Sequence, residues 1–370
     1  MISVFGSKVG NEEILQVSES INNQWLGMGP KVKKFENIFS KRLHIDNFIM
    51  VDSGSNALYM ACKLLNLKKG SEIIVPSFTW VACANSVILA GYKPVFCDVD
   101  LTSMNITVEN IKPHITEKTG AIMVVHYAGL PVDMDSILSL ELPVIEDAAH
   151  AVDSIYKGKS CGSIGDVGIY SFDAIKNLAV GEGGGLTMKS SELFDRAKTL
   201  RYCGIGKSGF DASETNHKWW EYNIRESFIK MNPSDISAAI GIAQIEKLNE
   251  LQLTRKSIWD HYHRSFSNIE EIITPLESNP DDKHSYFTYA IRVKNRDELA
   301  KYLLDNGVYT TVRYHPLHLN EIYKQTYKIL PNCETLNDEA LNIPLHPNMS
   351  AQDADVVVEL ISSFLRKNKF

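Results

Sequence analysis

Short apolar runs alternate with stretches of helical period between about residues 48 and 190, and each run ends at a polar residue or a glycine. This pattern is typical of a parallel β-sheet whose strands are joined by crossover helices. Strands are expected at Phe48–Val51, Glu72–Val75, Pro94–Cys97, Ala121–Val125 and Val144–Glu146. The apolar faces of two intervening helices are expected to consist of Ala57, Met60, Ala61, Leu64 and Leu65, and of Val81, Ala84, Val87, Ile88 and Ala90. The chain therefore predicts an α/β fold with a mostly parallel sheet between helices.

The rest of the chain predicts a second, smaller unit. With 370 residues, of which 44% are hydrophobic, the chain is long enough to build more than one core. A helical apolar pattern from Ile236 to Leu251 leads away from the sheet region. We expect a large domain over residues 1–245 and a smaller C-terminal α+β domain over residues 246–370.

Charge and the start of the chain argue against several classes of protein. A net charge of −7 without a basic stripe disfavours nucleic-acid binding, because phosphate backbones require concentrated positive charge. The first residues, MISVFGSKVGNEE, lack a signal-peptide pattern, and no apolar run approaches the roughly 20 residues that span a bilayer. Six cysteines without a C-x-x-C pair favour reduced thiols over disulfides or a zinc site. We expect a cytoplasmic protein without a metal site.

One lysine and one aspartate lie where ligands bind in open α/β sheets, just after the carboxyl ends of strands. Lys176 is part of the segment YSFDAIKNLAVGEGG (170–184), and Asp147 follows the strand Val144–Glu146, 29 positions earlier. A lysine that forms a Schiff base with pyridoxal phosphate (PLP) needs a carboxylate that keeps the pyridine nitrogen protonated. Lys176 and Asp147 fit these two roles. The alternatives are a solvated surface lysine and a helix N-cap.

A phosphate site is predicted at the segment VDSGSN (51–56), which follows a strand and opens a helix. There a glycine lets backbone N–H groups point at an anion, and the helix dipole favours negative charge. Gly54, Ser55 and Ser171 are the candidates for contacts with the cofactor phosphate. The alternatives are a plain helix cap and a strand-end serine that satisfies a local backbone group.

Two further side chains are candidates for contacts with the cofactor ring. His150, three residues after Asp147, is expected to bond the phenolic oxygen, and Trp80 is expected to stack on the ring. A satisfied histidine on a helix face and a core tryptophan are the alternatives. Residues 205–228 are polar and aromatic without a clear period, which predicts a long loop at a subunit interface.

These motifs, in this order, resemble the DegT/DnrJ/EryC1/StrS family of PLP-dependent nucleotide-sugar aminotransferases, which have the aspartate-aminotransferase (fold type I) architecture. The resemblance covers nearly the whole chain. It is carried by WLGMGPKVKKFE (25–36), SGSNAL (53–58), VPSFTWVACAN (75–85), VIEDAAHA (144–151), YKGKSCGSIGDVGIYSFDAIKN (156–177) with GEGG (181–184), IKMNPSDISAAIG (229–241), RYHPLH (313–318) and LNIPLHP (341–347).

The resemblance implies roles for the cofactor-binding residues. Lys176 would form the Schiff base and Asp147 would pair with the pyridine nitrogen. The phosphate would be held by Gly54, Ser55 and Ser171.

The same resemblance places Trp80 over the ring and His150 near the ring oxygen. Asn232 would reach the phosphate of the neighbouring subunit's cofactor, which implies a homodimer with sites at the subunit interface. Asp173 departs from the histidine, tyrosine or phenylalanine that is common after Ser-Phe, and it lies near the sugar pocket. The GEGG segment differs from the GDGG of many 3-keto-sugar enzymes, which favours a 4-keto or other carbonyl.

The implied reaction moves an amino group from L-glutamate to a keto sugar carried on a nucleotide diphosphate. The amino sugar nucleotide would serve the biosynthesis of lipopolysaccharide, another cell-surface glycan or a natural product. The candidates for contacts with this substrate are Asp173, Arg313 and His315, with Lys207, Lys218, Trp219, Trp220 and Arg225. Solvated loop charges and an interface aromatic pair are the alternative.

Two rival functions are considered. A PLP-dependent sugar dehydratase of the same family has histidine in place of the Schiff-base lysine, so Lys176 argues against it. A non-enzymatic sensor or regulator with the PLP fold has no need of a proton shuttle, so the complete set of lysine, aspartate, serine and glycine disfavours that role.

Overall fold

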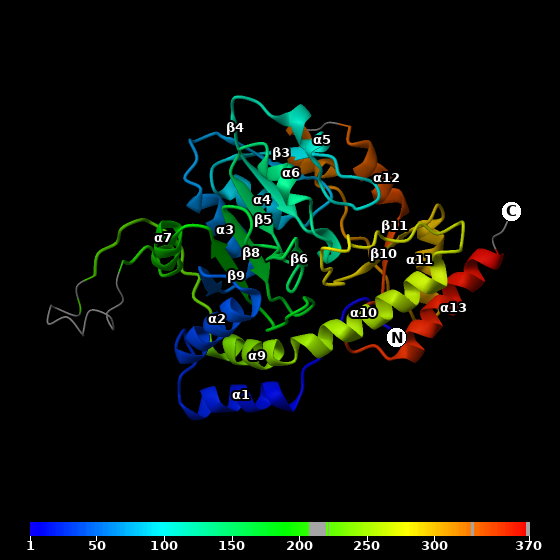
Figure 1. Ribbon diagram of the computed structural model, residues 1–370, viewed down its shortest axis with the longest axis horizontal. Coiled ribbons are helices and arrows are strands. Elements are labelled where there is room, and N and C mark those ends of the chain that lie inside the picture. Colours follow the sequence, from blue (N-terminus) through cyan, green and yellow to red (C-terminus); the bar gives the residue numbers. More distant parts are fainter. Residues whose placement is uncertain (207–219, 221, 327–328, 368–370) are drawn as a thin grey trace.

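The computed structural model describes residues 1–206, 220, 222–326 and 329–367, and its centre is a seven-stranded sheet (Figure 1). The strands are β1 (Phe48–Val51), β2 (Glu72–Pro76), β3 (Lys93–Cys97), β4 (Thr119–Val125), β5 (Val144–Asp147), β8 (Val167–Ser171) and β9 (Gly184–Met188). Their order is β1-β9-β8-β5-β4-β2-β3. Strands β3, β2, β4, β5 and β8 pair in parallel, whereas β9 runs antiparallel to both β8 and β1. The predicted mostly parallel α/β sheet is confirmed.

Helices cover both faces of the sheet because successive strand side chains point in opposite directions. Ile73 and Val75 of β2 belong to one buried cluster, and Ile74 between them belongs to the other. The first cluster includes residues of α3 (Gly54–Leu64), α4 (Ala82–Leu89) and α7 (Ser191–Arg201). The second includes residues of α2 (Pro30–Leu43), α5 (Val108–Ile111), α6 (Met134–Leu138) and α9 (Asp235–Glu246).

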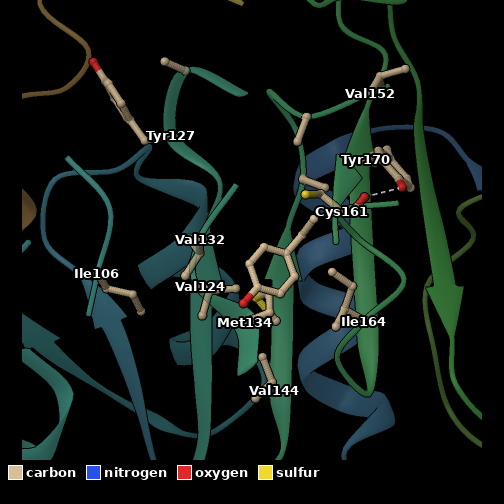
Figure 2. Packing of buried hydrophobic residues seen from close by; sticks show 14 of the residues in the cluster. Ile106, Val124, Tyr127, Val132, Met134, Val144, Val152, Cys161, Ile164 and Tyr170 are labelled. Atoms are coloured by element: carbon tan, nitrogen blue, oxygen red, sulfur yellow. Dashed lines mark hydrogen bonds between the residues drawn. The ribbon is translucent and has the colours of Figure 1, made fainter. Parts of the chain in front are cut away.

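Figure 2 shows part of the second cluster, around Val124, Val144 and Tyr170. The Tyr170 hydroxyl donates a hydrogen bond to the carbonyl of Cys161 at 2.5 Å, so this buried polar group is satisfied. Ala84 and Val87 of α4 are buried as expected, in the second and the first cluster respectively, but Ile88 is 44% exposed. The predicted apolar face of α4 is therefore wrong at this position.

The C-terminal part forms a smaller unit around a third buried cluster. Strands β10 (Tyr289–Arg292) and β11 (Ala340–Ile343) pair antiparallel, and α10 (Leu248–Phe266), α11 (Arg296–Asp305) and α13 (Ala351–Lys367) lie on the same side of the molecule (Figure 1). The other elements are α1 (Asn11–Asn22), α12 (Pro331–Glu339), β6 (Ile155–Tyr156) and β7 (Lys159–Ser160).

The single helical pattern expected from Ile236 onward is two helices, which are separated at Lys247. Helix α9 packs on α1 and α2, and α10 packs on α13. Leu317, Leu330 and other residues up to α12 belong to the core of the sheet, not to the third cluster. We propose that the two domains meet at the α9–α10 junction, with the segment around α12 returning to the large unit.

Two global features bear on the expected environment of the protein. Among the helices of the described residues, none is both long enough and apolar enough to cross a bilayer. All six cysteines are free thiols, and five of them are buried.

A buried carboxylate fixes the end of β5. Glu146 is fully buried, and three backbone N–H groups donate to it at 2.6–2.8 Å, from Gly162, Ile164 and Gly165. His126 Nε2 lies 2.9 Å from the same carboxylate, while His126 Nδ1 accepts a hydrogen bond from the Val132 N–H. His126 therefore donates from Nε2. The sequence predicted that β5 ends at Glu146, but Asp147 is the last residue of this strand. The network around Glu146 therefore also fixes the backbone of Asp147.

The substitution Glu146→Gln tests this network. A side-chain amide keeps one acceptor oxygen and places an NH₂ group against donors, so a buried N–H loses its partner. We expect the free energy of unfolding to fall by roughly 1–3 kcal/mol, measured by denaturant titration. The exposed Glu117→Gln is the matched control, and equal stabilities of the two variants would contradict the expectation.

Candidate active site

A cavity of about 340 Å³ lies at the carboxyl ends of the central strands. Its wall is built from the start of α3, the ends of β5 and β8, the turn after β8, and residues 311–314 of the C-terminal part. The lining residues that matter for chemistry are Phe5, Gly54, Ser55, Thr79, Trp80, Asp147, His150, Ser171, Asp173, Lys176, Arg313 and Tyr314. Outside the 205–228 segment, the cavity thus brings together all the predicted site residues except Asn232 and His315.

The exceptions have different surroundings. His315 is exposed, and its Nδ1 lies 2.8 Å from Asn337 Oδ1. The side-chain oxygen of Asn232 is buried without a hydrogen-bond partner in the described part of the chain. The role of Asn232 toward a neighbouring subunit stays a prediction.

The predicted loop at 205–228 is only partly described. The candidates Lys207, Lys218 and Trp219 lie outside the described residues. Trp220 and Arg225 are exposed and do not line the cavity. The described part of this segment has no helix or strand beyond an isolated bridge.

Lys176 is partly buried in the cavity wall, where its Nζ lies 4.8 Å from the centre of the Phe287 ring. Desolvation and then the positive charge of Arg313 lower the pKa of Lys176 from 10.5 to about 8. Asp147 and Asp173 act in the opposite direction but do not cancel these effects. The neutral amine that a nucleophile or a general base requires therefore forms at a lower pH than in an exposed lysine.

Asp147 is 4% exposed and is held by two donors. Its Oδ1 accepts a hydrogen bond from the Ala149 N–H at 2.9 Å, and its Oδ2 accepts one from the Cys83 thiol at 3.1 Å. The Cys83 sulfur also lies 3.3 Å from Thr79 Oγ1. The sequence reasoning missed Cys83 and Thr79, although both lie in the segment VPSFTWVACAN (75–85).

An anion cradle forms where α3 meets the end of β8. Ser53 caps α3, because its hydroxyl accepts a hydrogen bond from the Asn56 N–H at 3.2 Å. A Cβ atom on Gly54 would lie 2.8 Å from Ser171 Cβ and 3.0 Å from its Oγ. Only glycine permits this close approach, which brings the helix N-terminus and the Ser171 hydroxyl to one corner. Such a corner suits a phosphate.

His150 and its aromatic neighbours form another part of the wall. The His150 ring stacks on Phe287, with centroids 4.0 Å apart, and its Nε2 lies 3.0 Å from the Tyr314 hydroxyl. Burial, followed by the charges of Lys176 and Arg313, holds the pKa of His150 well below its usual value, so the ring is neutral. Its Nδ1 is buried without a hydrogen-bond partner among the described residues. This nitrogen is available to a bound group.

Trp80 lies at the open edge of the cavity. It is 55% exposed, and its ring centre is 5.6 Å from that of Tyr314. It lies two residues before α4, which begins at Ala82. The sequence also gave no sign of Phe5 and Phe287, which come from distant parts of the chain.

The fold and these side chains define an enzyme of fold type I that uses PLP. A lysine with a lowered pKa, a fixed buried carboxylate, an anion cradle and an unpartnered ring nitrogen share one cavity. These groups match the carbonyl, the ring nitrogen, the phosphate and the phenolic oxygen of that cofactor.

Comparison with known proteins supports this assignment to PLP-dependent enzymes. A model of the DegT/DnrJ/EryC1/StrS aminotransferase family matches residues 7–362. The dTDP-4-dehydro-2,3,6-trideoxy-D-glucose 4-aminotransferase of Saccharopolyspora spinosa is 34% identical over 365 residues, which cover 96% of this chain and 94% of the relative. The chain therefore belongs to the DegT/DnrJ/EryC1/StrS aminotransferase family, whose members use PLP.

Solved structures give the same result. The aminotransferase TlmJ from Streptoalloteichus hindustanus superimposes with a TM-score of 0.94 at 34% identity, over 100% of both chains. The putative sugar aminotransferase Spr1654 from Streptococcus pneumoniae, in its PMP-form, has a TM-score of 0.94 at 26% identity and covers 99% of this chain and 100% of its own.

The lowered pKa of Lys176 predicts how its reactivity depends on pH. In the enzyme freed of cofactor, the neutral amine should form with a midpoint near pH 8 instead of 10.5. Labelling by a small aldehyde and borohydride, followed by peptide mapping, should therefore rise through pH 8 at Lys176. Surface lysines in the same digest are the control, and labelling of Lys176 that follows theirs would contradict the prediction.

Proposed function

We propose that this chain transfers the amino group of L-glutamate to a keto sugar carried on a nucleotide diphosphate. The observation that carries the proposal is that Lys176, with its lowered pKa, shares one cavity with the fixed carboxylate of Asp147. The name of the Saccharopolyspora spinosa relative, which acts on a dTDP-linked 4-keto sugar, supports a 4-keto substrate for this chain. We propose a 4-keto sugar nucleotide as the acceptor.

Different residues of the cavity would bind different groups of the cofactor. The N–H groups at Gly54 and Ser55 and the hydroxyl of Ser171 would bind the phosphate, because they meet at the start of α3. Asp147 would pair with the ring nitrogen, and the unpartnered Nδ1 of His150 would face the phenolic oxygen. Trp80 would border the ring at the open edge of the cavity.

The chemistry needs a base that moves a proton at carbon. When it is bound, PLP supplies an electron sink for the electrons of the C–H bond that breaks at the carbon attached to the transferred nitrogen. Lys176 Nζ takes the proton from the donor α-carbon in the first half-reaction and supplies one to the sugar carbon in the second. The negative charge of Asp147 keeps the ring nitrogen protonated, and the aromatic wall limits access of water. The dehydratase alternative is disfavoured because a lysine occupies the base position.

A homodimer with shared sites is part of the proposal. Large apolar side chains are exposed on α1 and just after it, namely Ile14, Leu15, Ile21, Trp25 and Leu26. Their exposure in one chain supports burial against a second copy. Asn232 would then find its partner at the neighbouring subunit's cofactor phosphate. A cytoplasmic location and a product destined for a glycan such as lipopolysaccharide stay predictions.

Two half-reactions test the function. The PLP-loaded protein should lose its visible absorbance band when L-glutamate is added and should release 2-oxoglutarate. The resulting amine form should then recover the band with a dTDP-linked 4-keto sugar, and mass spectrometry should show the amino sugar nucleotide. Lys176→Ala is the control, which should show neither the band nor the transfer. If the wild type leaves every amino acid unchanged, the proposed function is wrong.

The substitution Asp147→Asn separates cofactor binding from catalysis. The amide keeps the size of the side chain but removes the charge that holds the ring nitrogen protonated. We expect bound cofactor and a rate of the glutamate half-reaction lower by about 10²- to 10³-fold, the range for loss of a preorganised electrostatic partner. Asp135→Asn, an exposed residue away from the cavity, is the matched control. Wild-type turnover in Asp147→Asn would refute the assigned role.

A further inference from the structure

Cys83 connects helix α4 to the carboxylate of Asp147. It is fully buried, and its thiol donates a hydrogen bond to Asp147 Oδ2 at 3.1 Å. The backbone at Cys83 is fixed as well, because its N–H donates to the Trp80 carbonyl at 3.0 Å and its carbonyl accepts a hydrogen bond from the Ser86 hydroxyl at 2.9 Å. The turn before α4 and the first turn of α4 therefore hold the sulfur in place.

The direction of the hydrogen bonds around this sulfur follows from its surroundings. Burial, and then the charge of Asp147, raise the pKa of the Cys83 thiol well above its usual value, so the thiol keeps its hydrogen. That hydrogen is directed to the carboxylate. Thr79 is 1% exposed, and its Oγ1 lies 3.3 Å from the sulfur, so the Thr79 hydroxyl is the donor in this second contact. The bonds form a chain from Thr79 through Cys83 to Asp147.

The two oxygens of the Asp147 carboxylate are held from different elements. Oδ1 accepts from the N–H of Ala149, which directly follows β5 and therefore moves with Asp147. Oδ2 accepts from Cys83, whose helix α4 follows β2, and β4 separates β2 from β5 in the sheet. Rotation of the carboxylate would break one of these bonds. Cys83 thus fixes the plane of the carboxylate relative to another part of the sheet.

Both donors to Asp147 are uncharged, which preserves the basicity of the carboxylate. A carboxylate that accepts strong hydrogen bonds is stabilised in its charged form and becomes a weaker base. A thiol is a weak donor, so it holds an oxygen in place with little effect on that basicity. Each carboxylate oxygen has further lone pairs, and Asp147 lines the cavity, so the carboxylate can still accept a hydrogen bond from a protonated ring nitrogen.

We propose that Cys83, supported by Thr79, is a positioning residue that holds the Asp147 carboxylate in the plane in which it pairs with the ring nitrogen of the cofactor. The inference rests on the role of Asp147 in the proposed function. Cys83 does not line the cavity, so it acts through Asp147 and not by contact with a substrate. Its loss should change the protonation of the ring nitrogen and the rate of proton transfer, but not the affinity for the amino-acid donor.

The test compares Cys83→Ala and Cys83→Ser with the matched control Cys62→Ala, which removes a buried thiol of α3 outside the cavity wall. Each protein is loaded with PLP that carries an isotopically labelled ring nitrogen, and NMR follows the protonation of this nitrogen as the pH is raised. For Cys83→Ala, we expect the pKa of the ring nitrogen to fall by about one unit, because the carboxylate is no longer held in plane. The maximal rate of the glutamate half-reaction should fall by about 10-fold, the factor for one lost hydrogen bond to a charged group, at an unchanged half-saturating glutamate concentration.

The other variants separate the hydrogen bond from packing. Cys83→Ser restores a donor on a shorter side chain and should recover part of both losses, whereas Cys62→Ala should match the wild type. Thr79→Val keeps the shape of threonine without its hydroxyl, so it should lower the pKa of the ring nitrogen by a smaller amount, and it serves if the Cys83 variants fail to fold.

A wild-type pKa of the ring nitrogen in Cys83→Ala, or losses in Cys83→Ser as large as those in Cys83→Ala, would overturn the inference. The NMR measurement requires only bound PLP and no amino acid. A wild type that reacts with no amino acid would therefore overturn the proposed function by a separate observation, so the two failures are distinguishable.

Discussion

The last two residues of β5 point in opposite directions, and the site depends on that alternation. Glu146 turns toward one face of the sheet, where three loop N–H groups and His126 satisfy it. Asp147 turns toward the other face, where the Ala149 N–H and the Cys83 thiol hold its carboxylate. One buried acid thus locks the strand end, and the next presents its charge to the cavity. A register slip of one residue would exchange the two roles.

The cavity balances two cations against two carboxylates at close range. Asp147 and Asp173 favour the charged form of Lys176, whereas desolvation and Arg313 disfavour it more strongly. Burial, and then the charges of Lys176 and Arg313, also lower the pKa of His150 in the same wall and keep its ring neutral. The site therefore contains a partly neutral lysine and a neutral histidine beside ionised groups. The surroundings of Lys176 and His150 thus provide a base and a hydrogen-bonding ring nitrogen from ordinary residue types.

The sheet and the central pair of site residues could be predicted from the sequence for a physical reason. Buried parallel strands leave continuous apolar runs, and polar residues after those runs mark the ligand-binding edge, so Lys176 and Asp147 carry local signals. Phe5 and Phe287 carry none, because an aromatic residue in an irregular segment has the same appearance in any core. Ile88 illustrates the opposite error, since an apolar residue at helical spacing was expected inside and is exposed. The role of Asn232 could not be judged from one chain, because its partner is expected on another.

Phe287 connects the C-terminal unit with the side chains of the candidate active site. Its ring comes from the segment just before β10, yet it touches Lys176, His150 and Arg313 together. Its N–H donates to the Ala128 carbonyl at 2.9 Å, which ties that segment to the loop after β4. A small displacement of the C-terminal unit would therefore alter the surroundings of all three side chains at once. The surroundings of the lysine, the histidine and the arginine are therefore coupled through one aromatic ring.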